Sequence, residues 1–138
     1  MYLLDTNVVS ELRKVRTGRA DQNVAAWAGA TPAEQQFVSV VTILELELGI
    51  LRLEQRDAAQ SGLLRRWLER GVLPAFAGRT LPVDIAVAQR AAALHVPSPR
   101  SERDSLIAAT ALVHGLVVVT RNAADFAPTG VRILDPWL

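Results

Sequence analysis

The chain has 138 residues, of which 50% are hydrophobic and 21% charged, with a formal net charge of +1. These values predict a single globular domain over residues 1–138 and exclude an intrinsically disordered chain. The absence of cysteine excludes disulfides, thiolate nucleophiles and zinc–thiolate sites. No signal-peptide pattern is present, and no apolar tract reaches the roughly 18 residues of a membrane span, so a cytoplasmic protein without membrane contact is expected.

Predicted strands and helices alternate along the first part of the chain. Helices follow from apolar residues at helical spacing, and strands from short apolar or β-branched runs. The expected elements are a strand at 2–5, helices at 6–14 and 23–30, a strand at 37–41, and a long helix from Thr42. Pro32 stops the second of these helices.

The same alternation continues to the end of the chain. The expected elements are helices at 61–72, 85–95 and 101–114, then strands at 116–120 and 131–134. Asp84 is the expected N-cap of the helix 85–95, and Gly115 is the expected stop of the helix 101–114. Strands separated by helices imply crossover connections. The sequence therefore predicts an α/β fold with a mainly parallel central sheet and helices on both faces, without specifying the strand order.

Four acidic residues lie where such a fold gathers functional groups, because ligands of open α/β sheets bind beyond the carboxyl ends of the strands. Asp5 closes the first predicted strand, Glu45 comes four residues after Val41, and Asp125 comes five residues after Thr120. Asp104 lies in the first turn of the helix 101–114, which reaches the same edge if it begins there. The sequence thus predicts four carboxylates along one edge of the sheet.

Each acid also has an ordinary structural explanation. Two pairs have the spacing of a capping box: Thr42 with Glu45, and Ser101 with Asp104. Asp5 is placed to cap the helix 6–14, and Asp125 is placed to lie in a turn. Capping does not require the four acids to share a sheet edge, so their joint placement favours a common site, while each cap stays an open alternative.

Four converging carboxylates favour a bound cation, because their mutual repulsion makes an empty site unfavourable. Ligation by oxygen alone selects Mg²⁺ or Mn²⁺ over zinc. Such an ion lowers the pKa of a bound water and stabilises charge on a phosphodiester. A histidine-based mechanism is not favoured, since His95 and His114 each end a predicted helix, where they complement the helix dipole.

Of the 15 basic residues, 14 are arginine and only Lys14 is lysine. The planar guanidinium suits bidentate phosphate binding. High-GC coding, which also enriches alanine, explains the same bias, and we favour that explanation. The cluster Arg13, Lys14, Arg16 and Arg19 is likewise expected to be a solvated loop.

Four segments around the acids resemble the motifs of the PIN-domain family, and within it the VapC and FitB-like toxins of bacterial toxin–antitoxin pairs. They are Leu-Leu-Asp5-Thr6-Asn7, Thr42-Ile-Leu-Glu45-Leu-Glu-Leu-Gly49, Asp104-Ser-Leu-Ile107-Ala108-Ala109-Thr-Ala111 and Thr120-Arg-Asn122-Ala-Ala-Asp125-Phe126. No segment is specific alone, but all four in order are. The resemblance covers the whole chain, without departure at the acids.

The resemblance implies a Mg²⁺- or Mn²⁺-dependent endoribonuclease that cleaves RNA as the toxin of such a pair, and a homodimer. The implied partner is a small antitoxin protein, whose other end would bind operator DNA. Asp5 and Asp104 would be the principal metal ligands, and Glu45 and Asp125 would complete the cluster. Thr120 and Asn122 would shape the cluster without binding the ion. Glu47 is excluded from the site, because it follows Glu45 by two residues, which is about 200° of rotation around the helix.

Two other functions stay open. An aspartyl-phosphate phosphatase or receiver would use Asp5 as phospho-acceptor, but such proteins usually need a lysine on a later strand, and Asn7 stands where the phosphatases have a second acid. The other alternative is a non-catalytic binding module with the PIN fold, which the presence of all four acids does not favour. Phosphate transfer from an acyl phosphate would support the first, and failure to bind Mn²⁺ the second.

Overall fold

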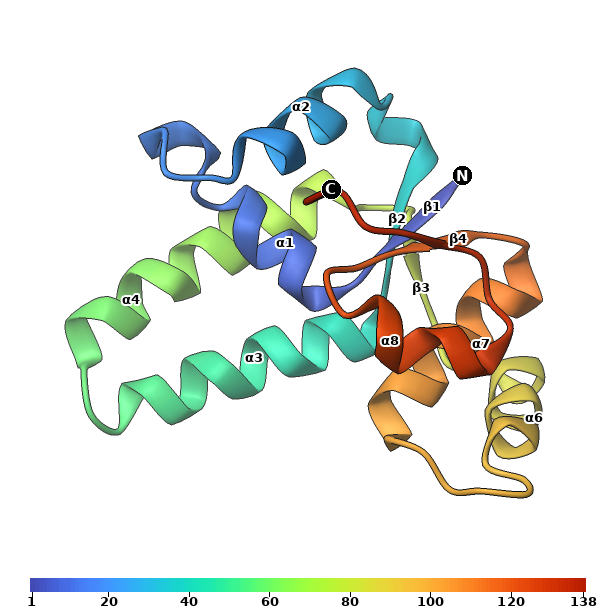
Figure 1. Ribbon diagram of the computed structural model, residues 1–138. Helices are drawn as coiled ribbons and strands as arrows, with labels where there is room; N and C mark the ends of the chain where they lie inside the picture. The colour runs from blue at the N-terminus through green and yellow to red at the C-terminus, as the bar shows by residue number, and fades with distance from the viewer.

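The centre of the molecule is a five-stranded sheet (Figure 1), seen in a computed structural model that describes all 138 residues. Its strands are β1 (Tyr2–Leu4), β2 (Gln36–Ser39), β3 (Thr80–Leu81), β4 (Val117–Val119) and β5 (Ile133–Leu134). They lie in the order β3-β2-β1-β4-β5, and every neighbouring pair is parallel. Parallel neighbours require crossover connections. The predicted α/β class is confirmed, and the sheet is wholly parallel.

Helices supply most of the connections between the strands. They are α1 (Thr6–Leu12), α2 (Gln22–Ala30), α3 (Val40–Glu54), α4 (Ala58–Trp67), α5 (Leu73–Ala75), α6 (Ile85–Leu94), α7 (Glu102–His114) and α8 (Ala123–Phe126). A π-helical turn (Leu68–Val72) joins α4 to α5, and short 3₁₀ turns lie at Val15–Thr17, Ala33–Gln35 and Ala127–Thr129. No helix has both the length and the apolarity to cross a membrane.

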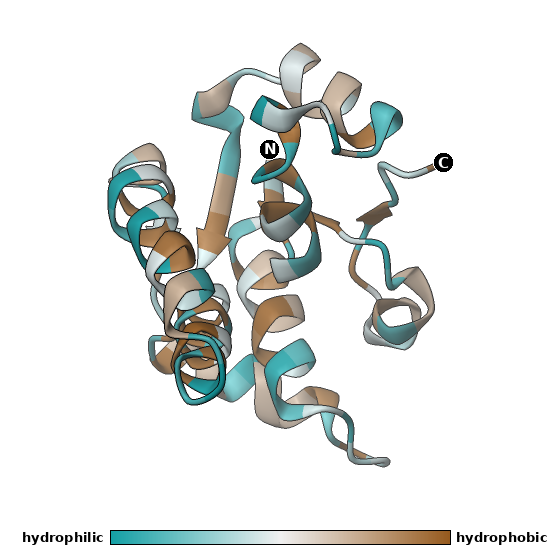
Figure 2. Cartoon of the chain, turned by 90° about the vertical axis from the view of Figure 1, so that its left-hand side faces the viewer, coloured by the Kyte–Doolittle hydropathy of each residue, from teal (hydrophilic) through white to brown (hydrophobic).

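The sheet supplies a hydrophobic core on each of its faces, because successive side chains of a strand point to opposite sides. Leu4 packs with Val8 of α1 and with apolar residues of α2, α3 and the π-helical turn. Leu3, its neighbour in β1, packs instead with Ile107 of α7 and Phe126 of α8. Figure 2 shows the hydrophobic colouring of the strands inside the molecule. Helices therefore cover both faces, as predicted.

The predicted start of the long helix at Thr42 is wrong. The strand β2 ends at Ser39, and α3 begins at Val40. Ser39 is the N-cap, since its hydroxyl accepts a hydrogen bond from the Val41 amide at 3.0 Å. The β-branched pair Val40–Val41 extends the apolar run of the strand, and β-propensity alone does not mark the boundary. Thr42 therefore lies inside the first turn, and no capping box with Glu45 forms.

Another helix boundary and one strand also differ from the prediction. The helix expected at 61–72 begins earlier, at Ala58, with Asp57 as its N-cap. The strand β3 was not predicted, because two residues are too short to show a period. The other expected caps are confirmed: Asp84 for α6, Ser101 for α7, and Gly115, whose left-handed φ of 69° ends α7.

Candidate active site

The four predicted acids lie along the edge of the sheet where the parallel strands end, although not close enough for three of them to share one ion. Asp5 directly follows β1, and Glu45 lies in the second turn of α3, which follows β2. Asp104 lies in the first turn of α7, and Asp125 in α8, after β4. The pKa of Asp104 is raised, first by burial and then by the negative charges of the other three acids. The fold therefore brings the four carboxylates into one electrostatic group.

Asp5 is the most constrained of these acids, with 6% of its surface exposed. Its Oδ1 accepts a hydrogen bond from the Thr6 amide at 2.8 Å, which caps α1. Its Oδ2 accepts from the Thr120 hydroxyl at 2.8 Å and from Asn7 Nδ2 at 3.3 Å. Burial raises the pKa of Asp5, and the hydrogen bonds oppose that rise. The capping explanation is therefore confirmed at this residue, and the role of Asp5 in the site stays a prediction.

Glu45 connects three helices. Its Oε1 accepts a hydrogen bond from the Thr6 hydroxyl at 2.7 Å, and the Thr6 and Thr42 hydroxyls lie 3.1 Å apart. Its Oε2 lies 3.7 Å from Nη1 of Arg103 on α7. We did not predict Thr6, Thr42 or Arg103 as site residues. The two threonines belong to motif segments, which was a usable signal, whereas nothing in the sequence pairs Arg103 with Glu45.

Thr120 holds Asp5 in place from the end of β4. Its side chain is fully buried, and its hydroxyl accepts from the Asn122 amide at 3.0 Å while donating to Asp5. Asn122 contributes through its backbone: its amide donates to Thr120, its carbonyl accepts from the Asp125 amide at 3.0 Å, and its side chain forms no cap. Asn7, which we did not predict as a site residue, contacts the site through its side chain. Its Nδ2 donates to both Asp5 and Thr120, and its Oδ1 accepts from the Arg121 amide at 3.3 Å.

Replacing Thr120 by valine tests this support. The variant Thr120→Val keeps the shape but leaves the Asn122 amide without its acceptor, so a loss of about 1–3 kcal/mol in unfolding free energy is expected. Mn²⁺ affinity should fall roughly 10–100-fold, as for other groups that orient metal ligands. Thr110→Val is the matched control, since Thr110 is also fully buried but donates to the Leu106 carbonyl. Calorimetric Mn²⁺ titrations giving equal affinities for both variants would contradict the proposed support.

The donor set fits a hard divalent cation. A cavity of about 270 Å³ between α7 and α8 is lined by Asp104, Ser105 and Asp125 together with Arg100, whereas Asp5 and Glu45 do not line it. The Ser105 hydroxyl is buried and has no hydrogen-bond partner, which in a polar cavity indicates room for a water or another ligand. All of these donors are oxygens, as Mg²⁺ and Mn²⁺ prefer. In this arrangement no three acidic or histidine side chains stand close enough together to bind one ion, so a cation bound by all four acids would require their side chains to move closer.

Glu47 lies outside this group, as predicted. Both of its carboxylate oxygens pair with Arg65 of α4, at 2.7 and 2.5 Å. The hydrogen bond from Arg65 lowers the pKa of Glu47. Glu47 therefore fastens α3 to α4.

A wholly parallel α/β sheet with four acids at its carboxyl edge defines the structural class of this protein. The family model described as PIN domain matches residues 2–130, so the chain belongs to the PIN domain family. The resemblance seen in the motif segments is confirmed.

Named relatives and solved structures resemble the chain over nearly its full length. It is 37% identical to the VapC ribonuclease Y4jK of Sinorhizobium fredii, over 99% of the chain and 98% of that protein. It is 36% identical to the toxin FitB of Neisseria gonorrhoeae, over 99% of each. The crystal structure of FitAcB from the same organism matches with a TM-score of 0.88 and 35% identity, over 99% of both chains. The structure of FitAB bound to an IR36 DNA fragment also gives a TM-score of 0.88, with 33% identity over 100% of this chain and 96% of that one.

Proposed function

We propose that this protein is a Mg²⁺- or Mn²⁺-dependent endoribonuclease that hydrolyses RNA phosphodiester bonds and acts as the toxin of a toxin–antitoxin pair. The observation that carries the proposal is the placement of Asp5, Glu45, Asp104 and Asp125 along one edge of the sheet, where their charges raise the pKa of Asp104. The full-length similarity to a relative named as a VapC ribonuclease supports the substrate class.

In this proposal, Asp5 and Asp104 would be the principal ligands of the ion, and Glu45 and Asp125 would complete the set. When bound, the ion supplies a water of lowered pKa and stabilises negative charge on the phosphodiester. The chain itself supplies orientation: the Thr120 hydroxyl fixes Asp5. Carboxylates held this way reach a productive geometry at a low reorganisation cost.

Chelation tests the function. The purified chain is expected to cleave a mixed RNA pool in Mg²⁺ or Mn²⁺ and to stop in EDTA, because no other group at the site replaces the ion. Excess Mn²⁺ added after EDTA should restore cleavage, which controls for damage by the chelator. Undiminished cleavage in EDTA would contradict the proposal. A chain that neither cleaves RNA nor binds Mn²⁺ would favour the non-catalytic binding module.

We further propose a small antitoxin protein as the partner, which would supply the binding of operator DNA. Support comes from a solved toxin–antitoxin complex of Klebsiella pneumoniae, which matches 99% of this chain at 27% identity with a TM-score of 0.66, and from the structure of FitAB, which includes a DNA fragment. Four carboxylates at one edge are chemically complementary to an arginine or lysine of such a partner. The homodimer implied by the sequence resemblance is part of the same proposal.

A further inference from the structure

Four arginines gather around Trp67 beyond the end of α1. They line a hollow of about 460 Å³ and are called here the arginine patch: Arg13, Arg16, Arg66 and Arg70. The first two follow α1, and the other two lie in α4 and the π-helical turn, so residues about fifty positions apart share one surface. All four are exposed. No acidic residue lines the hollow.

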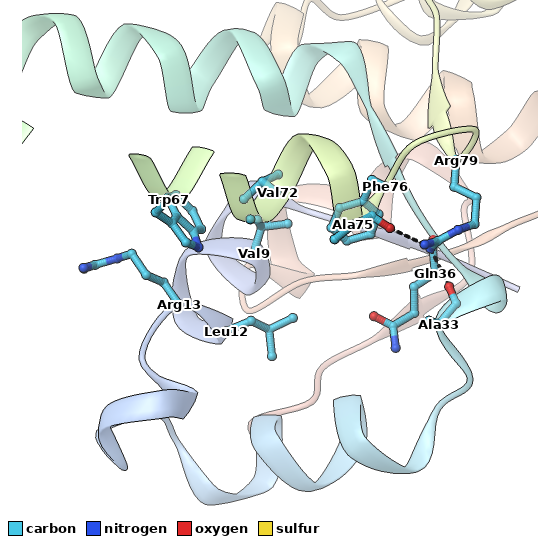
Figure 3. A pocket seen from close by; sticks show the side chains of 11 residues that line it. Val9, Leu12, Arg13, Ala33, Gln36, Trp67, Val72, Ala75, Phe76 and Arg79 are labelled. Carbon is cyan, nitrogen blue, oxygen red and sulfur yellow. Dashed lines mark hydrogen bonds between the residues drawn. The ribbon is translucent and has the colours of Figure 1, made fainter. Parts of the chain in front are cut away.

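The patch is not neutralised within the molecule. The ion pairs of the molecule join Lys14 to Glu11, Arg65 to Glu47 and Arg103 to Glu45, and none of them includes a patch arginine. Arg79 lies at the opposite end of a neighbouring apolar pocket (Figure 3), where it donates to the carbonyls of Ala33, Gln36 and Ala75. The four patch arginines therefore have no acidic partner within the molecule, and the only cation–π contact among them is that of Arg13 with the ring of Trp67.

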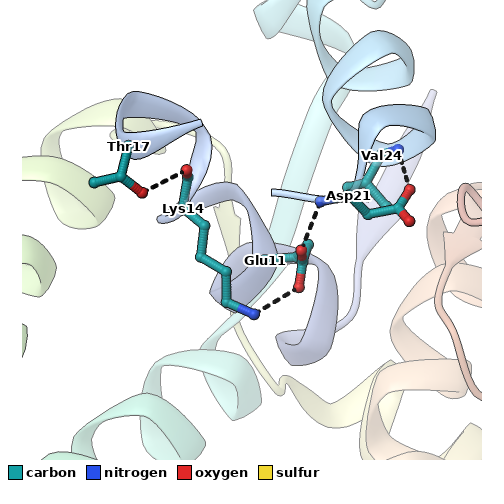
Figure 4. A network of polar contacts seen from close by, with 5 residues as sticks. All are labelled: Glu11, Lys14, Thr17, Asp21 and Val24. Carbon is teal, nitrogen blue, oxygen red and sulfur yellow. Dashed lines mark hydrogen bonds and ion pairs between the residues drawn. The ribbon is translucent and has the colours of Figure 1, made fainter. Parts of the chain in front are cut away.

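The loop that carries Arg13 and Arg16 is held in place (Figure 4). Glu11 binds Lys14 Nζ at 3.1 Å through one carboxylate oxygen and the Asp21 amide at 2.8 Å through the other. The Thr17 hydroxyl donates to the Lys14 carbonyl at 3.0 Å. This network uses the positive charge of Lys14 and fixes the loop, so the two arginines are presented with reduced ordering cost on binding.

The chemistry of the patch suits a single-stranded nucleic acid. Guanidinium groups bind phosphates bidentately, and aromatic rings stack on bases of any sequence. Trp67 is half-buried among the patch residues, and Arg13 Cζ lies 6.0 Å from the centre of its ring. Arginines interleaved with an aromatic ring distinguish such a surface from a solvated charge cluster.

We propose that the arginine patch is a second binding site for single-stranded RNA, which holds the strand whose scissile bond lies at the carboxylates; this rests on the proposed function. The helix α1 separates the two sites, since Asp5 precedes it and Arg13 follows it. The eight steps from Asp5 to Arg13 rise about 12 Å along the helix axis, a separation that one RNA strand can span. The carboxylates repel phosphates, and the patch supplies the attraction that keeps the strand bound.

Salt dependence of RNA binding tests the patch. In EDTA, a labelled single-stranded RNA oligonucleotide is titrated with wild type and with the double variant Arg66→Gln/Arg70→Gln at several salt concentrations. The slope of log affinity against log salt is negative, and each lost phosphate contact reduces its magnitude by about 0.7, so two reduce it by about 1.4. If the affinities coincide near 1 M salt, they differ by about 25-fold at about 0.1 M.

The control is Arg52→Gln/Arg56→Gln, which removes two exposed arginines at the far end of the α3–α4 hairpin and should keep the wild-type slope. An unchanged slope in the patch variant overturns the proposal. If that variant loses affinity for polyglutamate but keeps the RNA slope, the patch is a docking site for an acidic protein, and the proposal is again overturned. A wild type that does not cleave RNA overturns the proposed function; one that cleaves it, with no slope change in the variant, overturns the patch alone.

Discussion

Replacing Asp5 by asparagine is expected to lower the rate of RNA cleavage in Mn²⁺ by about 10²–10³-fold, since an ion at such a site contributes several kcal/mol. Asp5 is the acid that the fold holds most firmly, with hydrogen bonds to both of its carboxylate oxygens. Asparagine removes the charge but keeps one acceptor oxygen, and it caps helices about as well as aspartate. The variant should therefore stay folded while losing its activity.

The matched control is Asp84→Asn. Asp84 also caps a helix, since its carboxylate accepts from the Val87 amide at 3.0 Å, but it is exposed and lies outside the acidic group. Cleavage by this variant should equal that of the wild type. The measurement is the initial rate on one RNA pool, with circular dichroism to confirm folding. Wild-type rates from Asp5→Asn would remove Asp5 from the proposed machinery.

In metal-free protein, Asp104→Asn is expected to raise the free energy of unfolding. Removing a charge from the first turn of α7 costs about 0.3–1 kcal/mol through the helix dipole. Two carboxylates even about 8 Å apart repel by roughly 2 kcal/mol at an effective dielectric near 20. Relief of repulsion from the other acids should therefore outweigh the loss. Mn²⁺ should stabilise the wild type, as a ligand of the folded state does, and stabilise the variant much less.

The raised pKa of Asp104 also predicts how the stability difference between wild type and Asp104→Asn changes with pH. The pKa of Asp104 is raised, so between its ordinary and its raised value the folded protein binds more protons than the unfolded chain. The stability contributed by this group is present below the ordinary pKa of about 3.9 and is lost as the pH rises through the raised one. The advantage of the asparagine variant in EDTA should therefore grow from about pH 4 towards neutral pH.

The control for this experiment is Glu102→Gln, which removes a charge from the same first turn of α7. Glu102 is exposed and is not among the charges that raise the pKa of Asp104, so its removal should lower stability slightly. Thermal melts in EDTA and in excess Mn²⁺, at low ionic strength, measure both effects. If Asp104→Asn melts earlier in EDTA and gains as much from Mn²⁺ as the wild type does, then Asp104 is a cap and not a ligand.

Local sequence determined where the acids lie. Asp5, Glu45 and Asp125 each follow an apolar strand closely, and a parallel sheet brings strand ends to one edge whatever the strand order. The alternation of strands and helices fixed the α/β class in the same way. Both depend on patterns within a few residues, which local propensity controls. At Val40–Val41 the local pattern was misleading. These β-branched residues favour a strand, but in the structure they begin α3.

Contacts between distant residues were decided only by the tertiary structure. The hydrogen bonds from Thr120 to Asp5 and from Thr6 to Glu45 join residues 115 and 39 positions apart. Packing of α4 beside α1 likewise places Arg66 and Arg70 next to Arg13 and Arg16, which by themselves predicted only a solvated loop. A local pattern specifies which groups a segment presents, but the partners they meet depend on how the helices pack on the sheet, which no single segment encodes.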